Sequence, residues 1–123
     1  MDWTFRTDAP IYMQLCERLT LAIASGGYAP GERLPAVREL AVDAGVNPNT
    51  VQRALSELER LGLVYTQRTA GRFVTGDAER IGRERQRIAE ERTRSFLGAM
   101  EELGYDRGQT VALLEKMRGE REA

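Results

Sequence analysis

The sequence predicts a mostly helical α+β protein in which three short helices and a β-hairpin are followed by a tail of two helices. Apolar residues recur every three or four positions in three separate segments, which indicates amphipathic helices. The stretch that follows alternates around a turn, as short strands do. A long charged segment then carries few apolar residues. We therefore expect two domains, residues 1–76 and residues 77–123.

The first helix is expected to begin after Pro10 and to end before Gly26. Proline is tolerated at a helix start, and glycine favours a helix end. Between them Ile11, Leu15 and Leu19 recur every four residues, so one face of this helix is expected to be buried.

Two more helices are expected between Pro35 and Gly62. The second follows Pro35 and ends at Gly45. The third begins at Asn47, a favourable N-cap, with Pro48 in the first helical position. The third helix carries an apolar stripe of Val51, Ala54, Leu55, Leu58 and Leu61.

The segment "LVYTQRTAGRFVTG" is expected to form two short strands around a turn at Thr69–Gly71. Three helices followed by a hairpin form a winged helix-turn-helix, and the "DAGVN" link has the length and glycine that the motif needs. In this motif the N-terminal part of the third helix meets base edges in the DNA major groove. The opening turns of this helix are rich in hydrogen-bonding side chains: Asn47, Asn49, Thr50, Gln52 and Arg53.

The composition argues against an enzyme. The chain has no histidine and one cysteine, Cys16, which leaves few metal sites or nucleophile–base pairs and excludes an intrachain disulfide. We expect no cofactor and no bound metal. No segment has the apolar length of a signal peptide or a membrane span, so a soluble cytoplasmic protein is expected.

Four segments resemble the GntR family of bacterial transcription regulators: "PIYMQL", "GERLPAVRELA", "GVNPNTVQRALSELERLGLV" and "GRFV". The "NPNTVQRA" form and the short tail are similar to the YtrA subfamily. The resemblance covers Pro10 to Val74 strongly and the tail more loosely. It implies DNA contacts at Arg38, Asn47, Asn49, Thr50, Gln52 and Arg53. Many family members carry an arginine in place of Gln52.

The wing departs from the pattern of similar proteins, which often carry Arg-Gly-x-Gly. Here the run is Arg68-Thr69-Ala70-Gly71-Arg72. The Cβ groups of Thr69 and Ala70 disfavour deep insertion into the minor groove. Arg68, Thr69 and Arg72 remain candidate contacts to phosphates or to the groove.

Charge limits the kind of DNA binding that is expected. Residues 1–76 carry 8 arginines and 8 acidic residues, so this domain is formally neutral. A nonspecific DNA binder is usually basic. We therefore expect weak nonspecific affinity, with binding concentrated on a patterned face.

The tail is expected to form two helices, one from a cap at Asp77 to a stop before Gly104 and one capped by Asp106. Two such helices bury too little apolar surface to fold alone, so we expect a homodimer that joins two tails. The short tail of the similar subfamily is a dimerisation module. The expected interface residues are Ile88, Phe96, Leu97, Met100, Leu103, Val111, Leu114 and Met117.

The favoured hypothesis is a dimeric repressor that binds an inverted-repeat operator. Similar regulators often lie beside transporter genes, so transporter or envelope-stress targets are a working guess. The alternative is a winged-helix protein-interaction module without DNA binding. An unidentified small-molecule effector stays open, with the region of Phe96, Met100 and Leu114 as a possible site.

Overall fold

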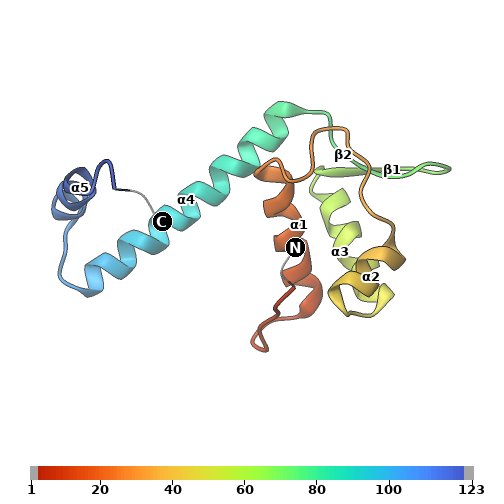
Figure 1. The fold of residues 1–123 in the computed structure, drawn as a ribbon, viewed down its shortest axis with the longest axis horizontal. Coiled ribbons are helices and arrows are strands. Elements are labelled where there is room, and N and C mark those ends of the chain that lie inside the picture. The colour runs from red at the N-terminus through yellow and green to blue at the C-terminus, as the bar shows by residue number, and fades with distance from the viewer. Residues whose placement is uncertain (1–2, 121–123) are drawn as a thin grey trace. The chain divides into compact units, whose positions relative to one another are not determined.

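The computed structural model describes residues 3–120 and confirms a mostly helical protein with a two-stranded wing. Its elements divide into two compact units, one running through Arg85 and one starting at Gln86. Their order along the chain is shown in Figure 1. The helices are α1 (Ile11–Ala24), α2 (Val37–Ala44), α3 (Pro48–Arg60), α4 (Ala78–Glu102) and α5 (Arg107–Lys116), and the strands are β1 (Val64–Gln67) and β2 (Gly71–Val74).

The core of the first unit lies where α3 packs against α1 and α2. Most of the expected apolar faces are buried, because the helical repeat brings every third or fourth side chain to one side. Ile11, at the start of the expected face of α1, is instead 43% exposed. Leu61 is the exception in the predicted stripe of α3, since it is only partly buried and packs at the edge of the core. The largest fully buried side chains of the two central helices are Leu15, Leu19, Ile23, Val51, Leu55 and Leu58.

The N-terminal arm is held to α1 through Gln14, a buried polar residue. Its Oε1 accepts a hydrogen bond from the backbone N–H of Arg6 at 2.7 Å, and its Nε2 donates to the carbonyls of Arg6 and Ala9. Trp3 packs against the core, and its indole N–H donates to Asp43 at 2.6 Å. These contacts fix the arm beside α1 and α2.

The turn between α2 and α3 forms as the sequence predicts. Gly45 takes a left-handed conformation with φ of 69°, and its N–H bonds back to α2. The side chain of Asn47 accepts a hydrogen bond from the N–H of Asn49 at 2.8 Å. Asn47 is therefore the N-cap of α3, with Pro48 as its first residue.

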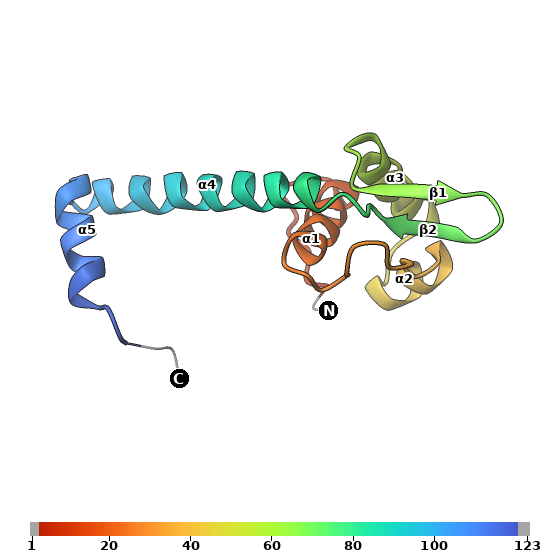
Figure 2. The same ribbon diagram turned by 90° about the horizontal axis from the view of Figure 1, so that it is seen from above.

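The wing is an antiparallel hairpin whose strands lie side by side in Figure 2. Its register pairs Val64 with Val74 and Gln67 with Gly71. The segment before α2 extends it, because Arg33 forms a bridge with Phe73. The wing is thus joined by backbone hydrogen bonds to the loop that leads into α2.

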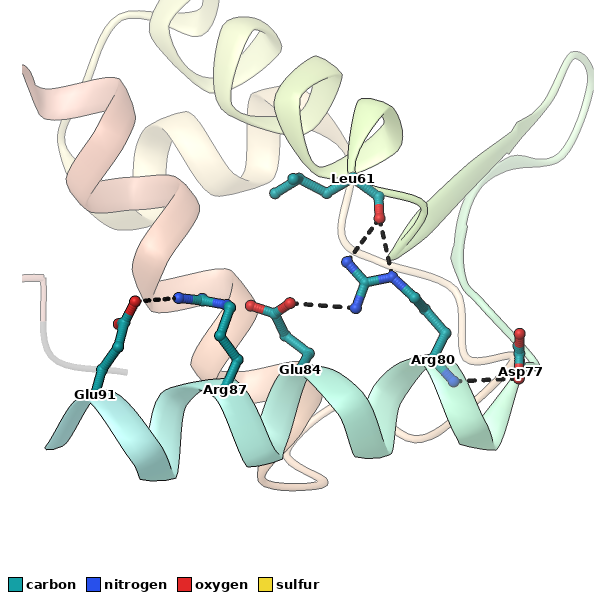
Figure 3. A network of polar contacts seen from close by, with 6 residues as sticks. All are labelled: Leu61, Asp77, Arg80, Glu84, Arg87 and Glu91. Carbon is teal, nitrogen blue, oxygen red and sulfur yellow. Dashed lines mark hydrogen bonds and ion pairs between the residues drawn. The ribbon is translucent and has the colours of Figure 1, made fainter. Parts of the chain in front are cut away.

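The start of α4 belongs to the first unit, which extends to Arg85 and so beyond the boundary expected between residues 76 and 77. Arg80 donates through Nε and Nη2 to the carbonyl of Leu61, at 3.1 and 2.8 Å, and through Nη1 to Glu84 at 3.2 Å (Figure 3). Arg85 donates to the carbonyl of Ala24 at 2.8 Å. The beginning of α4 therefore supplies donors to the C-terminal ends of α3 and α1.

The second unit contains the rest of α4 and α5. Arg87 and Glu91, four residues apart on one helix, form an ion pair at 2.7 Å (Figure 3). The capping box of α5 is also present, with Asp106 accepting from the N–H of Gln109 and Gln109 accepting from the N–H of Asp106. Within residues 3–120, no helix is both long and apolar enough to cross a membrane.

Truncation of Leu58 tests the central packing. This side chain is fully buried at the contact of α3 with α1. We expect Leu58→Ala to lower the free energy of unfolding by about 2–5 kcal/mol, since it leaves a cavity. Ser56→Ala, on the exposed side of the same helix, is the matched control and should change it by less than about 0.5 kcal/mol. Urea unfolding followed by circular dichroism measures both, and equal effects would contradict the packing.

Substitution of Gly71 tests the geometry of the wing. Gly71 has φ of 111°, and a Cβ there would lie 3.0 Å from Nε of Arg33. We expect Gly71→Ala to cost about 1–3 kcal/mol, because the backbone is unfavourable for L-residues and the space is occupied. Gly76→Ala is the control, since its Cβ would meet open space. It should be neutral or stabilise by up to about 1 kcal/mol. Thermal unfolding measures both variants. A larger loss of stability for Gly76→Ala than for Gly71→Ala would refute this geometry.

Candidate nucleic-acid interface

Helix α3 separates an apolar side from a polar side. Val51, Leu55 and Leu58 are buried in the core, whereas Gln52, Arg53 and Ser56 are exposed. The structure thus brings the predicted α3 residues together on the exposed side of its first turns. Asn47, Asn49, Gln52 and Arg53 are exposed, and Thr50 is half-buried. We call these five residues the polar front.

The members of the polar front differ in how far the fold already engages them. The Oδ1 of Asn47 caps the helix, so this oxygen has a structural role whether or not the residue meets a ligand. Asn49 and Gln52 expose amides that both donate and accept hydrogen bonds, which suits them to adenine edges. The front therefore offers a set of donors and acceptors on a rigid helix.

Arg53 is held by an aromatic ring that the sequence analysis did not single out. Its Cζ lies 3.8 Å from the centroid of the Tyr12 ring, at the start of α1. Ile11, Tyr12, Asn49, Thr50 and Arg53 line one open hollow of about 370 Å³. Tyr12 lies 41 positions before Arg53 in the chain, so no local periodicity could have revealed the contact.

Arg38 is exposed in the first turn of α2, the helix that precedes the turn leading into α3. The side chain of Glu39 accepts a hydrogen bond from the N–H of Ala36 at 3.2 Å and thereby caps this helix. Arg38 is thus on the surface, as DNA contact requires.

The wing places Arg68 and Thr69 at its exposed tip and Arg72 on its flank. Arg72 lies against α3, with Nε 4.0 Å from the carboxylate of Glu59. This Nε is buried and has no hydrogen-bond partner among residues 3–120. Thr66 also donates to Glu59, at 2.6 Å. Arg72 therefore helps to join the wing to α3, a contact that sequence spacing does not reveal.

A second hollow, of about 220 Å³, lies between the wing and the loop that leads into α2. Its lining includes Arg68 and Arg72, which the sequence analysis named, and Arg33 and Gln67, which it did not. Arg33 is exposed and lies close to Gly71. The basic residues of the wing therefore share a surface with an arginine from before α2.

The acidic residues of α3 lie in its C-terminal half, away from the polar front. Glu57 pairs with Arg60 at 2.5 Å, and the hydrogen bond from Arg60 lowers the pKa of Glu57. Glu59 is engaged by Thr66 and Arg72. No acidic side chain belongs to the front itself, so α3 presents a neutral-to-basic face in a formally neutral domain.

Cys16 has the character of a structural thiol. It is buried in the core of the first unit, and burial raises its pKa above the ordinary value. A raised pKa lowers the thiolate fraction, which is the reactive form. Within residues 3–120, no group of three or more His, Cys, Asp or Glu side chains is placed to hold a metal ion.

Known proteins match this chain along most of its length. The family model "Bacterial regulatory proteins, gntR family" matches residues 11–74. The HTH-type transcriptional regulator YhcF of Bacillus subtilis is 39% identical over 104 residues, which is 85% of this chain and 86% of YhcF. The HTH-type transcriptional repressor YtrA of the same organism is 40% identical over 74 residues, 60% of this chain and 57% of YtrA.

Solved structures give the same relationship. A GntR family transcriptional regulator from Listeria monocytogenes superposes with a TM-score of 0.83 at 38% identity, covering 91% of this chain and 98% of that one. The DNA-binding domain of AraR, solved in complex with operator ORX1, has a TM-score of 0.57 at 28% identity, covering 61% of this chain and 96% of that one. The chain belongs to the GntR family of bacterial regulatory proteins, and its short tail is consistent with the YtrA type.

Proposed function

We propose that this DNA-binding transcription regulator acts as a dimeric repressor, which reads an inverted-repeat operator with the polar front of α3. The observation that carries the proposal is the front itself. Exposed hydrogen-bonding side chains, without an acidic residue, occupy the N-terminal turns of the third helix of a winged helix-turn-helix. In this motif those turns meet base edges in the major groove.

Relatives support the operator-binding and repressor parts of the proposal. The AraR domain binds an operator with a fold that matches 61% of this chain. YtrA, 40% identical over its matched part, is a repressor. The family consists of transcription regulators and not of enzymes. We extend the AraR docking to Arg38 and the polar front here, and we place the regulator in the cytoplasm, where bacterial DNA lies.

The wing is proposed to contact the DNA backbone beside the major groove. Arg68 and Thr69 lie at its exposed tip, and Arg33 lies near its base. Arg72 is partly committed to Glu59, so its contribution to DNA binding is smaller than that of Arg68. The formal neutrality of residues 1–76 favours weak nonspecific binding and therefore a regulator that depends on its base contacts.

Dimerisation is proposed to occur through the second unit. Within residues 86–120, Thr110 is the only fully buried residue. Phe96 and Met100 recur at helical spacing on α4, and Leu103, just after the end of that helix, is 72% exposed. Exposed apolar side chains of this kind indicate a surface that is buried against a partner chain. The other predicted interface residues are Ile88 and Leu97, both half-buried, and Val111, Leu114 and Met117, all exposed.

Selection from random duplex DNA, followed by titration at several salt concentrations, tests the proposed function. A two-fold dimer should enrich an inverted repeat. With about 3–5 phosphate contacts from each domain, affinity should fall steeply as salt rises. Failure of a folded dimeric protein to enrich any sequence would contradict specific recognition, and would favour the protein-interaction alternative or a required co-ligand.

Substitutions in the polar front should weaken binding to the selected operator without unfolding the protein. We expect Asn49→Ala and Arg38→Ala each to cost about 1–3 kcal/mol, because a contact to the DNA is lost. Both side chains are exposed, so thermal unfolding should change little. Ser56→Ala, exposed but outside the front, is the control and should bind as the wild type does. Wild-type binding by both variants would place the recognition surface elsewhere.

Charges placed in the apolar face of the second unit should dissociate the dimer. The combined variant Leu103→Lys, Leu114→Lys removes one apolar side chain just after α4 and one from α5. At about 1.5–3 kcal/mol for each buried leucine, the two substitutions should raise the dimer Kd at least about 100-fold. Ser95→Lys, exposed on α4, is the control. Sedimentation equilibrium measures the masses, and a wild type that stays at its 13.8 kDa chain mass at tens of micromolar would refute the proposal.

A further inference from the structure

Arg53 stacks on Tyr12 and so joins α3 to α1. Neither residue is part of the hydrophobic core. Arg53 is exposed on α3, and Tyr12 is half-buried on α1. The guanidinium carbon lies 3.8 Å from the ring centroid, well within the range of a cation–π contact. Within residues 3–120, no hydrogen bond or ion pair occupies the Arg53 guanidinium.

A guanidinium stacked on a ring is oriented while its donors remain available. The ring contacts the face of the cation, whereas the N–H groups point outward in the plane of the fork. A free arginine side chain has several rotatable bonds and loses rotamer freedom when it binds. A side chain that is already stacked loses less, so its hydrogen bonds to a ligand form at a smaller entropic cost.

The surroundings of this pair point to DNA as the ligand. Tyr12 and Arg53 line the same open hollow as Asn49 and Thr50 of the polar front. An arginine fork fits two kinds of acceptor on DNA, namely the O6 and N7 atoms of guanine and the phosphate oxygens. Both are hydrogen-bond acceptors in the fork geometry.

We propose that Tyr12 is a positioning residue, which holds the guanidinium of Arg53 ready for an acceptor on the operator. The inference rests on the proposed DNA-binding function and adds to it a residue outside the helix-turn-helix. Tyr12 acts through its ring and not through its hydroxyl. Its contribution to operator binding therefore exists only when Arg53 is present.

A double-mutant cycle on the full-length protein, with the operator obtained by selection, tests this dependence. We expect Arg53→Ala to weaken binding about 5- to 150-fold, the range for loss of one arginine contact. Tyr12→Leu should weaken binding about 2- to 5-fold in the wild-type background, as expected for an exposed cation–π contact. In the Arg53→Ala background the same change should have no measurable effect. Equal effects of Tyr12→Leu in both backgrounds would overturn the proposal.

Tyr12→Phe separates the ring from the hydroxyl. It keeps the aromatic face and should bind the operator as the wild type does. Loss of binding as large as that of Tyr12→Leu would assign the role to the hydroxyl and overturn the proposal.

Arg53→Lys changes the cation of the pair and leaves Tyr12 in place. Its result therefore does not depend on whether a Tyr12 variant folds. It keeps the charge without the planar fork, so it should bind more weakly than the wild type, and undiminished binding would count against positioning.

The guanine and phosphate acceptors are distinguished by comparing the loss of binding across DNA sequences and across salt concentrations. A phosphate contact predicts that Arg53→Ala and Tyr12→Leu weaken binding to all sequences alike, with a salt slope lowered by about 1 for Arg53→Ala. A guanine contact predicts relaxed preference at one position of each half-site. Either pattern, with the dependence on Arg53, supports positioning. A wild-type protein that selects no operator would instead refute the proposed function, so the two failures are distinct.

Discussion

The burial of the apolar stripe of α3 against α1 is the contact on which the other features depend. Leu55 and Leu58 of α3 and Leu19 of α1 are shielded from water, so α3 cannot rotate about its axis without exposing them. Because the helix is held in one rotation, Asn49 and Gln52 are held outward. The orientation of the polar front is thus a consequence of the core and needs no separate stabilisation.

The ends of the two central helices are stabilised from outside the helix-turn-helix. The last carbonyls of a helix have no partner within it. Arg80 donates to the carbonyl of Leu61 after α3, and Arg85 donates to that of Ala24 in the last turn of α1. One short stretch of α4 therefore supports both helices that form the core, which explains why the first compact unit extends to Arg85.

Features with a local cause could be predicted from the sequence, and features with a distant cause could not. The caps at Asn47 and Asp106 depend on residues two or three positions away, and both form as expected. The contacts of Tyr12 with Arg53 and of Arg80 with Leu61 join positions far apart in the chain. The burial of the first turns of α4 likewise depends on tertiary packing. The functional roles of the front and of the tail residues remain predictions.

The division of α3 into two sides has a consequence for how such a regulator can diverge. Asn49 and Gln52 are exposed, so exchanging them for other polar residues leaves the core intact. If the polar front reads the operator as proposed, duplicated copies of such a gene can acquire new target sites by a few substitutions, without first gaining stability to tolerate them. Arg53 is less free to vary, because its ring partner lies on a different helix and the two would have to change together.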